Sequence, residues 1–157
     1  MDIPVDETIT ALRGEGRFPI KYGYAAVGRV VEIGPDVPAE WLGRLVFAFN
    51  PHESHFLAAP NELMPAPPGL APEAAAFLPN METAVNLVMD GQPMLGERVM
   101  VFGQGVVGLL TTALLACFPL ARLVTLDRYA PRREKSLAMG AHFSLDPAVP
   151  LDASPPL

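Results

Sequence analysis

The pattern of apolar and polar residues changes character near residue 98. From there on, short apolar runs alternate with longer amphipathic segments. The pattern predicts strands at 98–102, 122–126 and 142–145 and helices at 105–118 and 131–139. Strands that alternate with helices form a parallel sheet with right-handed crossovers. This part of the chain therefore predicts an α/β fold.

The preceding part of the chain predicts an antiparallel β unit instead. Three short β-rich runs are bounded by Gly, Pro and Asn, at 26–33, 44–49 and 55–58. A proline-rich stretch then leads to an alanine-rich helix from Pro72, which Pro79 should interrupt. We expect three parts: a β unit at 1–71, a helical link at 72–97 and an α/β unit at 98–157.

The most specific signal for chemistry lies between the strand at 98–102 and the helix after it. Residues 103–108 read Gly-Gln-Gly-Val-Val-Gly, and Asp127 follows nineteen positions after the last of these glycines, at the end of the next apolar run. Strand, glycine turn, helix and distal acid arrive in the order of a dinucleotide-binding fingerprint. The pattern predicts a site for a cofactor of the NAD type.

Each position of the fingerprint has a physical role. Gly103 permits a sharp turn, Gly105 lets the backbone approach a pyrophosphate, and Gly108 lets the helix pack closely. The N–H groups at the helix start, including those of Val106 and Val107, would face the phosphates.

The acid and the arginines after it decide between NAD and NADP. The carboxylate of Asp127 would accept from the ribose hydroxyls and repel a 2′-phosphate, which favours NAD. Arg128, Arg132 and Arg133 follow and could partly neutralise the acid; we place Arg128 and Arg132 near the ribose. The alternative is a doubly wound half with solvated arginines and no ligand.

Charge and composition exclude several classes of partner. The formal net charge of −6 argues against a nucleic-acid surface. The charge-free stretch at 99–121 is divided by glycines and Pro119, so no membrane span is expected. The expected partner is a small-molecule substrate, and a homo-oligomer stays open. The single Cys117, expected to be a core thiol, excludes a disulfide within the chain, which suits the cytoplasm.

Further short motifs occur in a fixed order along the chain. They lie at 18–34, 43–46, 82–84 and 96–99. With the glycine turn, they resemble the medium-chain dehydrogenase/reductase superfamily, which includes the zinc-type alcohol dehydrogenases. Residues 21–28, 51–52 and 80–84 resemble most the subgroup of bacteriochlorophyllide hydroxyethyl dehydrogenase. The resemblance implies a partial GroES-like β-barrel followed by a truncated Rossmann domain, a doubly wound parallel sheet, so that the chain is expected to be a fragment.

The resemblance also implies hydride transfer between a nicotinamide cofactor and an alcohol or carbonyl. Tyr24 and Ala25 stand where the superfamily carries a zinc-ligating His and the Glu after it, so zinc is not expected. The phenol of Tyr24 could act as a general acid or simply pack in the barrel, and Thr83 could contact the nicotinamide or cap its helix. For His52 and His55, three positions apart, backbone hydrogen bonding is favoured over metal binding.

Two other functions stay open at this point. One is a non-catalytic NAD-binding or degenerate fragment, because the usual zinc positions are not filled. The other is a zinc-independent enzyme similar to quinone reductases, acting on activated alkenes or carbonyls.

Overall fold

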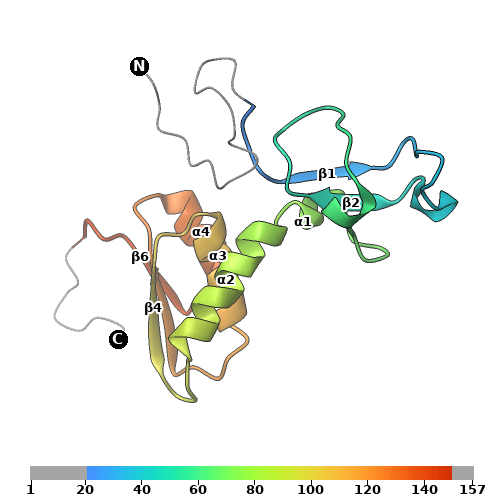
Figure 1. Ribbon diagram of the computed structural model, residues 1–157. Coiled ribbons are helices and arrows are strands. Elements are labelled where there is room, and N and C mark those ends of the chain that lie inside the picture. Colours follow the sequence, from blue (N-terminus) through green and yellow to red (C-terminus); the bar gives the residue numbers. More distant parts are fainter. Residues whose placement is uncertain (1–20, 150–157) are drawn as a thin grey trace. The chain divides into compact units, whose positions relative to one another are not determined.

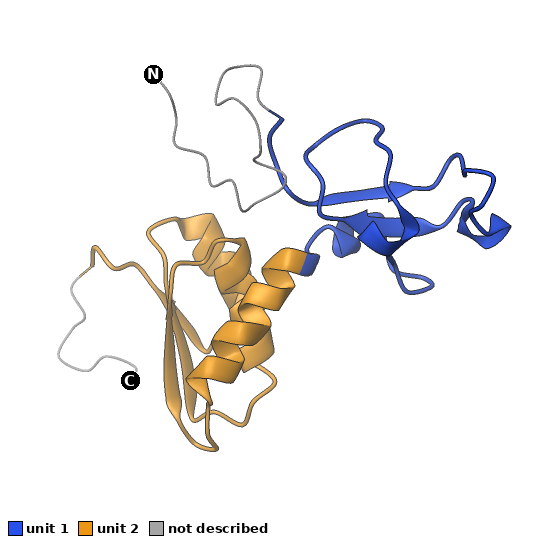
Figure 2. Cartoon of the chain, viewed as in Figure 1, with its two compact units in different colours: residues 1–78 blue, residues 79–157 orange. Residues whose placement is uncertain are grey.

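A computed structural model describes residues 21–149 of the 157-residue chain. The chain divides into two compact units, Met1–Leu78 and Pro79–Leu157, coloured blue and orange in Figure 2. The boundary between the units falls inside the segment predicted to be a helical link. In the described residues, each unit contains one three-stranded sheet.

The first unit is built on an antiparallel sheet in the order β1-β2-β3. Its strands are β1 (Ala26–Arg29), β2 (Leu45–Ala48) and β3 (Leu63–Pro65). Short helical turns flank them: η2 (Ala39–Trp41), η3 (Pro60–Glu62) and α1 (Pro72–Ala75). Val46, Phe47 and Ala48 of the central strand are buried. This strand therefore carries the small core of the unit.

Two strand predictions in this unit were wrong. Residues 55–58 form no strand, and Leu57 is fully exposed. The third strand is β3 instead, a run of three residues that ends in Pro65 and that the pattern did not predict. Proline is tolerated there because β3 lies at the edge of the described sheet. Strand β1 also ends at Arg29 rather than at 33, although Val30 still donates to the carbonyl oxygen of Arg44 at 3.0 Å.

The second unit is built on a parallel sheet in the order β4-β5-β6 (Figure 1). Its elements are β4 (Arg98–Phe102), α3 (Val106–Leu115), β5 (Arg122–Leu126), α4 (Ala130–Ala138) and β6 (Phe143–Leu145). On β5, Leu123 packs with Leu115 of α3, and the hydroxyl of Thr125 lies 2.7 Å from that of Ser136 on α4. Residues two apart in a strand face the same side, so both helices cover the same face of the sheet.

Helix α3 is shorter than predicted. It ends at Leu115, because the proline at 119 disfavours helical backbone just before it. Cys117 therefore lies beyond the helix and is exposed, so its prediction as a core thiol was wrong.

Helix α2 (Leu78–Gly91) begins one residue before Pro79. The proline occupies the first turn, where its missing N–H has no helical partner to lose. The break between α1 and α2 therefore comes before Pro79 rather than at it. Val88 of α2 packs against Leu115 and Leu123 in the core of the second unit.

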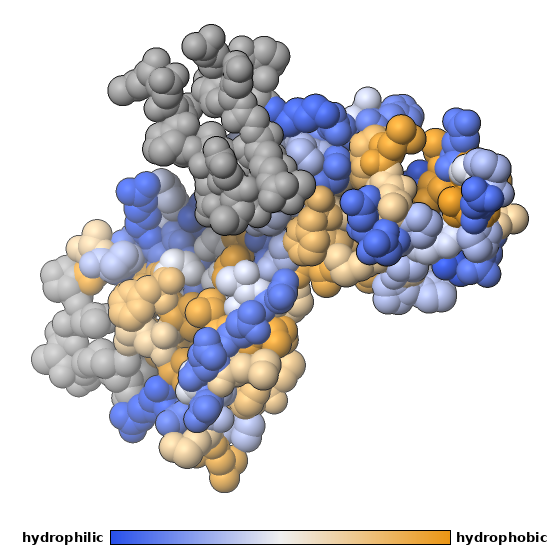
Figure 3. All heavy atoms as spheres, viewed as in Figure 1, coloured by the Kyte–Doolittle hydropathy of each residue, from blue (hydrophilic) through white to orange (hydrophobic). Residues whose placement is uncertain are grey.

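Large apolar side chains also remain at the surface, and apolar residues are orange in Figure 3. In the second unit they include Leu87, Met89, Leu95 and Phe102. Between residues 21 and 149, the helices are too short and too polar to cross a lipid bilayer.

Candidate dinucleotide site

The glycine turn connects β4 to α3 and lies beside the end of β5. Gly103 has a φ of +82°, a left-handed conformation that glycine adopts without strain. Its N–H donates to the carbonyl oxygen of Leu126 at 2.8 Å, so the parallel ladder continues one step beyond Phe102. The backbone then turns through Gly105, which is extended and caps the start of α3.

The other two glycines of the turn face different surroundings. A Cβ at Gly108 would lie 1.9 Å from the carbonyl oxygen of Gly103, whereas a Cβ at Gly105 would meet no atom within 4 Å. The N–H of Leu109 donates to Gly105 at 2.9 Å and closes the first turn of α3. The N–H groups of Val106 and Val107 precede that bond and have no partner inside the helix. Open space at Gly105 thus adjoins a helix start that favours an anion.

The carboxylate of Asp127 turns back from the end of β5 onto the glycine turn. Its Oδ2 accepts from the main-chain N–H of Gln104 at 2.8 Å, and its Oδ1 accepts from the N–H of Tyr129 at 2.8 Å. The bond from Tyr129 is the main cause that lowers the pKa of Asp127. The N–H of Gln104 and the Arg132 guanidinium act in the same direction, while burial opposes them. Asp127 is therefore an anion at neutral pH.

The carboxylate keeps acceptor capacity for a ligand. A carboxylate oxygen offers two acceptor positions, and the Tyr129 N–H occupies one of those on Oδ1. Oδ2 also faces Nη1 of Arg132 at 3.6 Å. Only 6% of Asp127 is exposed, so a ligand can reach a small part of the carboxylate. This geometry suits one or two hydroxyl donors better than a bulky anion.

The three arginines after Asp127 divide into two groups. Arg128 and Arg132 stack on the ring of Tyr129 at 4.5 Å and 4.9 Å, and all three side chains are exposed. Arg133 instead donates to the main-chain oxygen of Asp127 at 2.8 Å and to the Asp146 carboxylate at 3.0 Å. Arg133 therefore ties together the ends of β5 and β6, and the other two line the outer edge of the site.

The structure places the two predicted catalytic residues as follows. Tyr24 lies shortly before β1 in the first unit and is 55% exposed. Thr83 lies on α2, where its hydroxyl donates to the carbonyl oxygen of Pro79 at 3.0 Å. That bond satisfies the donor of Thr83 within its own helix. The catalytic roles of Tyr24 and Thr83 remain predictions.

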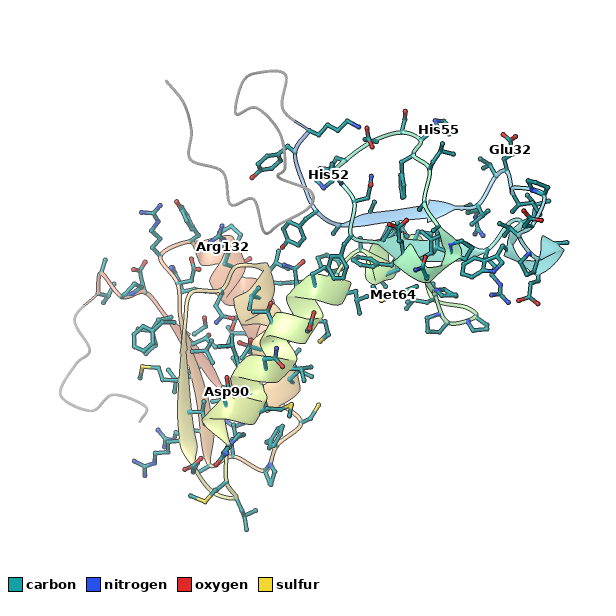
Figure 4. All side chains as sticks on the ribbon, viewed as in Figure 1. Glu32, His52, His55, Met64, Asp90 and Arg132 are labelled. Atoms are coloured by element: carbon teal, nitrogen blue, oxygen red, sulfur yellow. The ribbon has the colours of Figure 1, made fainter. Side chains whose placement is uncertain are left out.

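The two histidines lie on the loop that follows β2, labelled in Figure 4. The N–H of His52 donates to Tyr22 at 2.8 Å, and a Cβ at Gly23 would lie 2.3 Å from the His52 ring. The imidazole therefore rests on the Gly23 backbone, while His55 is exposed. Within residues 21–149, no three His, Cys, Asp or Glu residues come together as a metal site would require.

The sequence analysis did not single out Gln104 as a functional residue. The residue is completely buried, and its Oε1 accepts from the hydroxyl of Thr112 at 3.0 Å. The available signal was a glutamine inside a stretch that is otherwise apolar or small. A buried amide needs hydrogen-bond partners, and its presence there indicates that they exist.

No protein-family model matches the chain, and no curated protein matches it. Solved structures do match it. One is the short chain alcohol dehydrogenase rspB from E. coli CFT073 with NADH, with 17% identity, a TM-score of 0.68, and 96% of this chain and 53% of that chain covered. A second is mycobacterial Rv1454c with NADPH, with 26% identity, a TM-score of 0.62, and 92% and 48% covered. A third is the quinone oxidoreductase from Thermus thermophilus, studied also with NADPH, with 29% identity, a TM-score of 0.54, and 66% and 37% covered.

These likenesses confirm the predicted fold class, a partial GroES-like β unit followed by a Rossmann-type unit. The chain spans about half the length of the first two of these structures. The matching structures are alcohol dehydrogenase-like and quinone oxidoreductases. The narrower likeness to the bacteriochlorophyllide subgroup remains a prediction.

Proposed function

We propose that this chain binds a nicotinamide dinucleotide and serves an oxidoreductase of the alcohol dehydrogenase-like type. One observation carries the proposal: open space at Gly105, an anion-favouring helix start and the Asp127 carboxylate adjoin one turn. Structures similar to this chain were solved with NADH or NADPH, which supports a cofactor of this class.

The residues of the turn would bind and orient the cofactor. The pyrophosphate would lie at Gly105 against the N–H groups of Val106 and Val107. Asp127 would accept from the adenosine ribose, with Arg132 beside it. When bound, the nicotinamide supplies the hydride chemistry, and the chain contributes position and electrostatics.

We propose that the site prefers NAD to NADP. The lowered pKa keeps Asp127 charged, and its carboxylate would repel a 2′-phosphate. Arg128 and Arg132 offset part of this repulsion from the exposed side of Tyr129. NADPH should therefore bind more weakly without being excluded.

Tyr24 is our candidate for the group that polarises the substrate oxygen. Since Tyr24 and Ala25 stand in place of a zinc-ligating His and its Glu, the proposal needs no zinc, and an exposed phenol can donate to a carbonyl oxygen. Thr83 would contact the nicotinamide through its methyl group or its remaining lone pair. A small alcohol or carbonyl compound is the substrate class, and a cytoplasmic location stays part of the proposal.

A second candidate function is zinc-independent reduction of quinones or activated alkenes. The likeness to the Thermus thermophilus quinone oxidoreductase, at 29% identity, favours it. Both candidates share the dinucleotide site and differ in the hydride acceptor.

The test is hydride transfer by the purified chain. The chain is mixed with NADH and, separately, with aldehydes, ketones, quinones and enones, and the loss of nicotinamide absorbance is followed. Oxidation of NADH by aldehydes or ketones supports the first candidate, and oxidation by quinones or enones alone supports the second. No transfer to any acceptor by a folded chain that binds NADH would contradict both.

A further inference from the structure

Gln104 joins three parts of the dinucleotide site from inside the protein. Its Nε2 donates to the carbonyl oxygen of Gly103 at 3.2 Å, and its Oε1 accepts from Thr112 on α3 at 3.0 Å. Its main-chain N–H donates to Asp127 at 2.8 Å. Gln104 and Thr112 are both completely buried. The turn, the helix and the acid are thus connected through one residue.

A glycine turn needs such a restraint. Gly103 and Gly105 have no Cβ to limit their backbone angles, so the turn would otherwise sample several conformations. When only a fraction of the molecules holds the binding conformation, the apparent dissociation constant rises by the inverse of that fraction. A buried amide also loses stability if it leaves its partners, which makes the bonded arrangement the favoured one.

We propose that Gln104 and Thr112 are positioning residues, which hold the turn and Asp127 in the geometry that binds the dinucleotide before the ligand arrives. Neither side chain needs to touch the cofactor, because both act through Gly103 and Asp127. The inference rests on the proposed function, since it concerns the same site.

The chain offers a matched set of variants. Thr112→Val keeps the side-chain shape and removes the hydroxyl that bonds to Gln104. Thr111→Val removes the hydroxyl of the adjacent buried residue, which donates at 2.9 Å to Val107 inside α3 and does not reach the turn. Thr112→Ser keeps the hydroxyl and should restore binding. Gln104→Met, of similar length and without the amide, tests the same bonds from the other side if Thr112→Val does not fold.

Two readouts separate positioning from a merely structural role. The first is titration with NADH well below the melting temperature, followed by nicotinamide fluorescence. We expect Thr112→Val to raise the dissociation constant roughly five- to tenfold, and Thr111→Val and Thr112→Ser to stay within about twofold of the wild type. The second readout is hydrogen exchange at the main-chain N–H of Gln104, which should speed up in Thr112→Val alone.

The outcomes distinguish the inference from the proposed function. If the wild type binds NADH and Thr112→Val and Thr111→Val change its affinity equally, the positioning role is wrong and the site stands. If folded wild type binds no NADH, the proposed function fails and the inference fails with it. Faster exchange at Gln104 together with weaker NADH binding, both confined to Thr112→Val and Gln104→Met, would support it.

Discussion

The carbonyl oxygen of Gly103 occupies the place where a side chain at Gly108 would begin, only 1.9 Å from the ideal Cβ position. This contact sets the first turn of α3 against the end of β4. A Cβ at Gly105 would meet no atom within 4 Å, although it belongs to the same turn. Gly108 therefore serves packing, and Gly105 serves access to a ligand.

Gly108→Ala should destabilise the second unit. The added methyl group must displace the Gly103 backbone, and overpacking of this kind costs about 1–3 kcal/mol. Urea unfolding measures the loss in the free energy of unfolding. Gly91→Ala is the control, because a Cβ at this position near the end of α2 meets nothing. Equal stability of the two variants would contradict the packing role.

Gly105→Ala should have the opposite profile. We expect its free energy of unfolding to stay within about 0.5 kcal/mol of the wild type, since the methyl group meets no protein atom. Its affinity for NADH should fall at least about tenfold, because the methyl group occupies the space assigned to the pyrophosphate. Urea unfolding and calorimetric titration check the two halves of this prediction. Unchanged affinity would remove Gly105 from the site.

The sequence predicted β4 and β5 to the residue, because each is an apolar run with a clear boundary: Gly103 ends the first, and Asp127 ends the second. It misplaced the end of α3 and missed β3, whose three residues carry no period that separates strand from loop. The glycine turn was legible from spacing alone.

The Gln104 network was not predictable in the same way. Its bond to Asp127 joins residues 23 positions apart, and no local pattern encodes a contact between two strand ends. The roles of Tyr24 and Thr83 depend on a substrate, so neither the sequence nor the fold decides them.

The lowered pKa of Asp127 predicts how stability depends on pH. A carboxyl whose pKa is lower in the folded state stabilises the fold above its ordinary pKa of 3.8, and the contribution is lost as pH falls through the folded value. Asp127→Asn should therefore be less stable at neutral pH and should lose less stability on acidification below about pH 4. Urea unfolding across this range tests it. Parallel pH profiles for the two proteins would be inconsistent with the assigned hydrogen bonds.

Asp127→Ser should shift the cofactor preference toward NADPH. Removal of the carboxylate ends the repulsion of a 2′-phosphate and leaves Arg128 and Arg132 to attract it. We expect the ratio of NADH to NADPH affinity to fall at least about tenfold, measured by fluorescence titration. Asp90→Ser removes one exposed negative charge elsewhere in the unit and should leave the ratio unchanged. A similar shift in both variants would mean that net charge, not the site, sets the preference.

Tyr24→Phe should reduce turnover and leave NADH affinity unchanged. The loss of a general acid lowers the rate by about a hundredfold or more. Steady-state kinetics with the best acceptor from the hydride-transfer screen measures the effect. Tyr22→Phe is the matched control, since Tyr22 is another exposed tyrosine of the same segment. Wild-type turnover in Tyr24→Phe would rule out the phenol as the acid.

The central claim is that the turn from Gly103 to Gly108, together with Asp127, binds a nicotinamide dinucleotide. Titration of the purified chain with NADH, with nicotinamide fluorescence and thermal stability followed in the same samples, tests this claim most directly. We predict saturable binding and a rise in melting temperature for the wild type, and neither for Gly105→Ala. A folded wild-type chain that shows no binding and no stabilisation, or a Gly105→Ala variant that binds equally well, would contradict the account.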